Sequence, residues 1–211
     1  PAGETGPRPL TAEARVKPDP NGWTPLVPSV DTRHVYVSAS SGNDNWSGLD
    51  PLNPKRTIQA GIALLRQAHP DWLHLKCGDT FGGGLPDWFL SGRSANEPMV
   101  VTTYGPSPDR PRFHCGTGFG LSVHGGAIHD VAFVGLHFVA DTYDGSNGQP
   151  YGVSLLQPCT RVLIEDCEIE RFFTNLRFQG YQGNHQALKL RRSIIADAYT
   201  TGTGHAQGIY V

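Results

Sequence analysis

Hydrophobic residues follow two different spacings along this chain. A helical spacing occurs once, in TIQAGIALLRQAHPD, where Ile58, Ile62 and Leu65 fall at i, i+4 and i+7. Thr57 is placed to act as the N-cap of this helix, and Pro70 is placed to stop it. The pattern therefore predicts one amphipathic helix of about three turns.

Short β-type runs replace the helical spacing from Asp71 onward. Two kinds of run alternate, and each kind can be overlaid on itself. The second kind aligns VAFVGLHF, VLIEDCEI and LKLRRSII, which begin at 131, 162 and 188. The first kind aligns four apolar positions at intervals of 32, 23 and 33 residues: Leu121, Val153, Leu176 and Ile209. Repeats of this size predict stacked coils, because one coil cannot bury its inner face alone.

The chain divides into an arm and one coiled domain. Residues 1–30 hold seven prolines and almost no apolar periodicity, which predicts an extended arm on a surface or on a partner. The domain spans 31–211, with an N-terminal cap over 31–70 and coils over 71–211. Because GHAQGIYV ends inside a strand of the repeat, we expect either further coils or a covering molecule there. Self-assembly, in which residues 1–30 and the last coil contact other copies of the chain, would also cover this open end.

Composition narrows the class of protein. The 26 glycines and 17 prolines, with few charged residues, suit a turn-rich β protein. The 17 basic and 19 acidic residues nearly balance, so the charge gives no reason to expect nucleic acid or an anionic membrane surface as a partner. No apolar run approaches the roughly 20 residues that a membrane-spanning helix needs.

Two further features concern the cellular location. The sequence starts at Pro1 without a basic-then-apolar leader, so its numbering starts either after a removed signal peptide or at the first ordered residue. We expect a secreted, extracellular or periplasmic protein. Four cysteines form no CxxC pair, which argues against zinc-ribbon and thioredoxin-like sites and leaves a disulfide open: Cys77, Cys115, Cys159 and Cys167.

The region from 35 to 211 resembles secreted right-handed parallel β-helix proteins of the pectate-lyase-like superfamily. Those proteins commonly open with a strand, a Gly-Asp-x-x-x-Gly loop, a proline, a Thr-Ile-x-x-Ala helix and a strand that ends in Lys-x-Gly-Asp. The matching residues here are Gly42, Asp44, Gly48, Pro54, Thr57, Ile58, Ala60, Lys76, Gly78 and Asp79. The resemblance implies a right-handed parallel β-helix whose first coil is capped by the helix. It leaves the function open, because this architecture serves lyases, hydrolases, epimerases, adhesins and structural proteins.

Polar side chains are predicted to line the outside of the coils. With Leu121 and its equivalents inside, alternation places four neighbours outward in one column: Ser122, Ser154, Arg177 and Tyr210. A second column holds His124, Leu156 and Gln179, and His205 lies at a corner before the last strand. Such a surface suits an acidic polysaccharide, because Arg177 can pair with a carboxylate and Tyr210 offers a face for a sugar ring. The alternative is an ordinary solvated sheet face.

Resemblance to the lyases implies β-elimination on a uronate polymer. A Lys or Arg base removes the proton α to the carboxylate, often with Ca²⁺ neutralising that carboxylate. The available bases are Lys189, Arg191 and Arg177, which are the candidate catalytic residues. The alternative for Arg191 is a surface ion pair with Glu165 of the preceding coil.

Acidic residues suggest two other kinds of site. A hydrolase needs two carboxylates roughly 5–10 Å apart, and the candidates are Asp166, Glu168 and Glu170, with Asp141 and Asp144 before them. Asp44 and Asp50, with Asn43 and Asn45, are candidate Ca²⁺ ligands. In both cases the alternative is that these residues close turns and coil corners through their own side chains.

The sequence thus predicts a secreted, carbohydrate-active β-helix protein that binds or cleaves an extracellular polysaccharide. The alternative from another class is a structural or assembly protein whose arm and open coil end contact neighbouring molecules. A glycan-binding module without catalysis is the third hypothesis.

Overall fold

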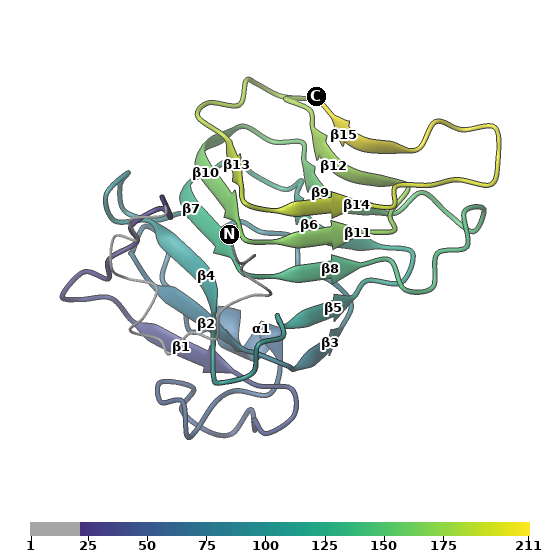
Figure 1. The fold of residues 1–211 in the computed structure, drawn as a ribbon. Coiled ribbons are helices and arrows are strands. Elements are labelled where there is room, and N and C mark those ends of the chain that lie inside the picture. The colour runs from purple at the N-terminus through teal and green to yellow at the C-terminus, as the bar shows by residue number, and fades with distance from the viewer. Residues whose placement is uncertain (1–21) are drawn as a thin grey trace, which may run out of the picture.

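Short parallel strands fold the chain into stacked coils in the computed structural model, which describes residues 22–211 (Figure 1). The elements in chain order are β1 (His34–Val37), α1 (Ile58–Ile62), β2 (Trp72–Lys76), β3 (Thr80–Gly82), β4 (Met99–Tyr104), β5 (Arg112–His114), β6 (Phe119–Val123), β7 (Ile128–Val134), β8 (His137–Val139), β9 (Tyr151–Leu155), β10 (Cys159–Glu165), β11 (Glu168–Glu170), β12 (Thr174–Phe178), β13 (Lys189–Arg191), β14 (Ile194–Ala196) and β15 (Gln207–Tyr210).

The strands build three sheets, and every pair of neighbouring strands is parallel. A six-stranded sheet has the order β1-β2-β4-β7-β10-β13, a five-stranded sheet β3-β5-β8-β11-β14, and a four-stranded sheet β6-β9-β12-β15. Each full coil therefore contributes one strand to each sheet, as in a parallel β-helix. The prediction of a parallel solenoid is confirmed, whereas its right-handed winding stays a prediction.

The predicted overlay of the coils matches the strand register. Leu121 pairs with Val153, Val153 with Leu176 and Leu176 with Ile209. The second kind of run is also aligned as expected, since Val162 pairs with Val131. The first three residues of the Leu121 row are buried, but Ile209 in the last coil is exposed.

Rows of apolar side chains fill the coil interior. Phe81, Phe113 and Phe138 stack in consecutive coils of the five-stranded sheet, with ring centroids 5.3 and 4.9 Å apart. The four cysteines are buried and form no disulfide with one another. Burial raises the pKa of the Cys167 thiol to about 12, which makes it an unreactive core residue.

The helix α1 is shorter than the sequence predicts. Thr57 is its N-cap, accepting a hydrogen bond from the Ala60 amide, but the helix has five residues and ends well before Pro70. Gly61 lies so close to the first two strands that an added Cβ would be 2.4 Å from Val37 Cγ2. Beyond this point the backbone hydrogen bonds no longer follow the i to i−4 spacing of an α-helix. The Leu64 carbonyl accepts a hydrogen bond from an arginine side chain and not from a backbone amide of the helix. No helix among residues 22–211 is long and apolar enough to span a membrane.

The described part of the predicted arm lies against the outer face of the six-stranded sheet. Leu26 packs on an apolar patch that includes Trp72 and Leu163. Arg191 of the last coil donates hydrogen bonds to the Thr24 hydroxyl at 2.6 Å and to the Gly22 carbonyl at 2.7 Å. This segment therefore runs across several coils and fastens them together. The rest of the predicted arm, 1–21, lies outside the described residues.

Candidate functional site

The outer face of the four-stranded sheet brings several predicted residues together. Ser122, Ser154, Arg177 and Tyr210 occupy one register position on β6, β9, β12 and β15, which is the predicted outward column. His124 directly follows β6. We call this surface the Arg177 face.

Arg177 is held in place by two neighbouring side chains of the preceding coil. Its Nε and Nη2 atoms donate to Ser154 Oγ at 3.0 and 2.7 Å, and its guanidinium carbon lies 3.7 Å from the centre of the Tyr151 ring. Burial lowers the pKa of Arg177. No carboxylate among the described residues pairs with this guanidinium. Arg177 is thus a fixed cation without an acidic partner in that part of the chain.

His124 is fixed through both its backbone and its ring. Asp87, in the loop before β4, accepts a hydrogen bond from the His124 amide at 2.9 Å, and Gln157 donates to the His124 carbonyl at 2.9 Å. The ring Nε2 lies 2.8 Å from Ser154 Oγ. Burial lowers the pKa of His124, the Asp87 charge opposes this shift, and the Arg177 charge adds to it.

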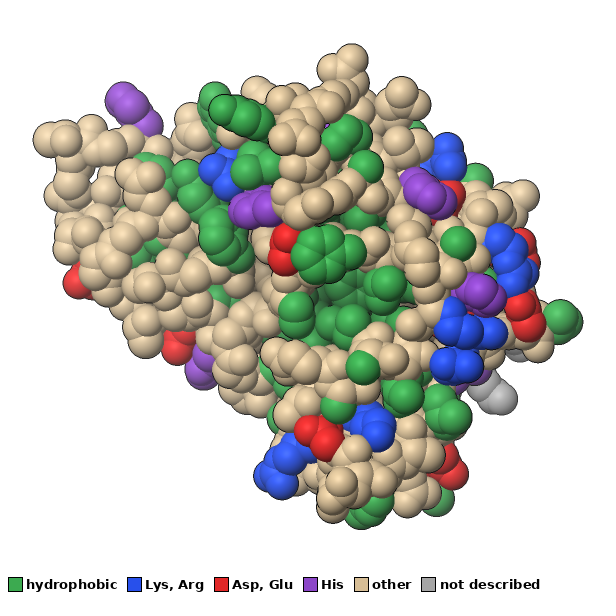
Figure 2. Space-filling view, turned by 180° about the vertical axis from the view of Figure 1, so that it is seen from behind, with side chains coloured by type: hydrophobic (Ala, Val, Ile, Leu, Met, Phe, Trp, Pro, Cys, Tyr) green, Lys and Arg blue, Asp and Glu red, His purple; other side chains and the backbone are tan. Residues whose placement is uncertain are grey.

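Aromatic rings flank these polar groups. Phe119 and Tyr151 stack with centroids 5.7 Å apart at an interplanar angle of 11°. Phe119, Phe89 and Tyr210 are 39%, 55% and 38% exposed, so solvent reaches apolar ring surface on this face. Figure 2 shows the side of the molecule that is turned away in Figure 1. Hydrophobic side chains gather on this side, with single basic, acidic and histidine side chains among them. Exposed rings beside fixed hydrogen-bonding groups are suited to a ligand with both apolar and polar surface.

Two other predicted binding residues lie at the margin of the Arg177 face. Gln179 directly follows β12 and is half-buried, whereas His205 is exposed in the loop before β15. Sequence reasoning missed Asp87, because nothing in GGGLPDWFL indicates where this loop will lie. It also missed Phe119 and Tyr151, although the overlay of Leu121 on Val153 already places these two rings side by side.

The three predicted bases do not form one site. Lys189 and Arg191 lie on β13 of the six-stranded sheet, and Arg177 lies on β12 of the four-stranded sheet. Arg191 is engaged by the N-terminal segment and by Glu165, with Nε 3.7 Å from Oε1. The Glu165 side chain is only 2% exposed, so this ion pair is partly buried and not a surface pair. The three candidate bases therefore lie on two different faces, because alternate runs of the repeat belong to different sheets.

The predicted hydrolase carboxylates form an ion-pair cluster on the five-stranded sheet. His137 Nε2 lies 2.9 Å from Glu170 Oε1, and one ligand atom each of His137, Glu168 and Glu170 lies within 4.8 Å of the others. Arg110 pairs with Glu168 at 3.4 Å and with Asp166 at 2.8 Å. Although the carboxylate spacing is near that of retaining hydrolases, about 5 Å, Asp166 and Glu168 are paired with Arg110, and Glu170 lies 3.5 Å from Arg112.

Of the remaining acidic candidates, Asp144 closes a turn and Asp141 links the corners of two successive coils. Asp141 accepts a hydrogen bond from the Gly116 amide at 2.9 Å, and Asp144 accepts one from the Ser146 amide at 2.8 Å. These contacts are the alternative that the sequence left open.

Asp44 and Asp50 do not form a joint metal site. Asp44 accepts hydrogen bonds from the Arg56 and Thr57 amides at 2.7 and 2.9 Å and from the Thr57 hydroxyl at 2.9 Å. Burial alone would raise the pKa of Asp44, but the hydrogen bonds from Thr57 and Arg56 outweigh it and lower the pKa. Asp50 accepts a bond from the Leu52 amide at 2.7 Å. Because both carboxylates serve the loop, their arrangement does not fit Ca²⁺, which needs several free oxygens around one point.

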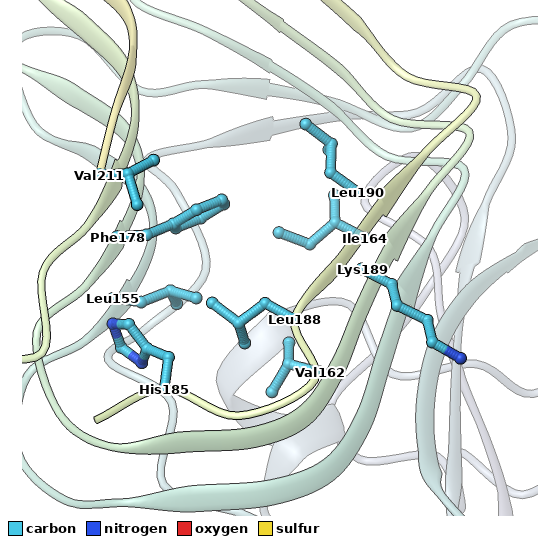
Figure 3. Close-up of a pocket in the computed structure, with 9 residues that line it drawn as sticks. All are labelled: Leu155, Val162, Ile164, Phe178, His185, Leu188, Lys189, Leu190 and Val211. Carbon is cyan, nitrogen blue, oxygen red and sulfur yellow. The ribbon is translucent and has the colours of Figure 1, made fainter. Parts of the chain in front are cut away.

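An apolar cavity of about 280 Å³ lies inside the last coil (Figure 3). The Lys189 side chain extends away from it in Figure 3, while apolar residues point into it. The lining residues include Leu155, Val162, Ile164, Phe178, Leu188, Leu190 and Val211. A cavity with this lining is coil interior and offers few hydrogen-bonding groups to a sugar.

Comparison with known proteins identifies a fold and no family. No protein-family model matches the chain, and no curated protein sequence matches it. Two solved structures of the GH136 lacto-N-biosidase from Eubacterium ramulus, a selenomethionine derivative and the native protein, are similar with TM-scores of 0.57 and 0.56 and 12% identity. The match covers 76% of this chain and 34% and 33% of theirs, so the chain spans about a third of their length. At this identity the likeness shows the fold alone.

Proposed function

We propose that this protein is carbohydrate-active and binds an extracellular polysaccharide on the Arg177 face. The observation that carries the proposal is Arg177 itself, a fixed guanidinium without a carboxylate partner among the described residues, next to exposed aromatic rings. Guanidinium groups bind carboxylates in a planar, bidentate way. Similarity to structures of a glycoside hydrolase supports the carbohydrate-active class.

An acidic glycan is the substrate class that this surface fits best. The polymer is proposed to place a uronate carboxylate on Arg177 and a sugar ring on Tyr210 or Phe119. β-Elimination is the reaction to test first, with Arg177 as the cation that holds the uronate carboxylate and offsets its charge. Right-handed winding, the capping role of α1 and export from the cell belong to the same proposal.

An assembly role is the second candidate, and a different observation favours it. The edges of β13, β14 and β15 end the three sheets, and the cavity beside them is apolar. Unpaired strand edges next to apolar interior attract further strands. In this hypothesis, residues 1–30 and the last coil contact neighbouring molecules.

Binding and turnover are tested on a panel of acidic and neutral polysaccharides, with and without added Ca²⁺. Unsaturated-uronate absorbance would establish elimination, new reducing ends alone would establish hydrolysis, and saturable binding alone would establish a glycan-binding module. If no polysaccharide binds while the protein forms fibres or stable complexes, the carbohydrate hypothesis is wrong and the assembly hypothesis is favoured.

The Arg177→Ala variant is expected to bind its best polysaccharide about 30-fold more weakly, because it loses the only cation that the column presents. Lys189→Ala is the matched control, since it removes an exposed cation from the six-stranded sheet and should leave the affinity unchanged. Isothermal titration measures both, and circular dichroism checks the fold. Equal affinities for the two variants would remove Arg177 from the site.

A further inference from the structure

Ser154 lies at the centre of the hydrogen bonds on the Arg177 face. Its side chain is fully buried, at 0% exposure, on β9. Its Oγ receives the two Arg177 contacts at 3.0 and 2.7 Å and lies 2.8 Å from His124 Nε2. Three polar atoms of two residues therefore converge on one hydroxyl.

The donor and acceptor count on this hydroxyl determines where the protons lie. A serine hydroxyl has one proton to donate and two lone pairs that accept, and a guanidinium can only donate. With both lone pairs facing Arg177, the Ser154 proton points to His124 Nε2. This nitrogen must then accept, so the His124 ring is neutral and carries its proton on Nδ1.

The surroundings of His124 hold the ring in this state. Asp87 and Gln157 fix its backbone, and the Phe119 ring contacts it edge-on with centroids 4.9 Å apart. The charged groups that act on the ring are Asp87, from the loop before β4, and Arg177, from β12. Protonation of Nε2 would remove the acceptor that Ser154 uses and place a second cation beside Arg177. Burial and Arg177 both lower the pKa of His124, in agreement with a neutral ring.

We infer that Ser154 is a positioning residue of this face: it fixes His124 as a neutral imidazole protonated on Nδ1 and holds Arg177 over Tyr151, so that both residues present hydrogen-bond donors to the glycan. The glycan part of this inference rests on the proposed function, whereas the protonation state of His124 does not. A ligand rich in acceptor oxygens matches a surface that presents donors.

The first test is the protonation state of His124 in the full chain, measured by long-range ¹H–¹⁵N correlation spectra across a pH titration. The wild type should show the Nδ1–H tautomer. Ser154→Ala should raise the midpoint of the His124 titration, because the hydroxyl that favours the neutral ring is gone, and Ser154→Thr should restore it. An Nε2–H tautomer, or a midpoint that Ser154→Ala leaves unchanged, would overturn the inference.

The second test is affinity for the polysaccharide that binds the wild type best. Ser154→Ala is expected to weaken binding about tenfold, because a hydrogen bond that positions Arg177 and His124 is lost. Ser154→Thr restores the hydroxyl and should recover most of the affinity. Unchanged affinity in Ser154→Ala would contradict a positioning role. If the wild type binds no polysaccharide, the proposed function fails on its own, and the tautomer of His124 still decides whether Ser154 fixes that ring.

Discussion

Replacing Phe113 with alanine is expected to lower the free energy of unfolding by about 3–5 kcal/mol. Phe113 is the fully buried middle ring of a stack, between Phe81 and Phe138. Backbone hydrogen bonds between coils fix the spacing of the strands, so the coils can collapse only partly around the missing ring. Urea denaturation followed by circular dichroism measures the change.

Two further variants keep this prediction testable. Phe113→Leu retains part of the volume and should fold with a smaller loss, even if the alanine variant does not fold. Phe89→Ala is the control, since its ring is 55% exposed and its removal should change stability by less than about 1 kcal/mol. A loss below about 1 kcal/mol for Phe113→Ala would contradict the central place of this stack in the core.

Acidification from pH 6 to pH 4.5 is expected to destabilise the protein by about 2 kcal/mol through His74 alone. His74 is buried on β2, where its Nε2 bonds His34 Nδ1 at 2.9 Å and its ring stacks on Tyr36. Burial, with a smaller contribution from His34, lowers the pKa of His74 to about 3. Between pH 6.5 and pH 3 the unfolded chain binds a proton that the folded chain excludes. Stability is therefore greatest above pH 6.5 and falls by about 1.4 kcal/mol per pH unit below it.

The His74→Phe variant tests this pH dependence, because it keeps an aromatic ring and removes the titrating group. Its free energy of unfolding is measured by urea denaturation at several pH values from 6 to 4.5. It should fall less steeply than that of the wild type, by about 1.4 kcal/mol per pH unit, which is the effect of one proton. His205→Gln changes an exposed histidine and should keep the wild-type slope. Equal slopes in His74→Phe and wild type would show that His74 titrates alike in both states.

The repeat made much of the fold predictable from sequence. Leu121, Val153 and Leu176 are inward residues of successive coils, and their spacing is visible because each coil must bury the same position. The outward column with Arg177 follows from simple alternation. The length of the helix was not predictable. Gly61 brings the helix close to Val37, and this contact with a strand distant in sequence does not appear in the local pattern of residues.

The candidate site was predictable only where the strand register alone defines it. Arg177 and Tyr210 share a register position, so alternation found them. Asp87 enters from a loop whose path no local pattern describes, and it reaches His124 across 37 positions of sequence. The sequence could not decide among Lys189, Arg191 and Arg177 as bases, because the angle between two sheets does not appear in the spacing of residues within a run.

Amide chemical-shift mapping with a bound oligosaccharide tests whether glycan binds on the Arg177 face. Saturable shifts are expected at His124, Tyr151, Arg177 and Tyr210, on the four-stranded sheet, with β8 and β11 of the five-stranded sheet unaffected. Shifts confined to the His137 and Glu168 cluster, or to the strands around the last-coil cavity, would contradict binding on this face.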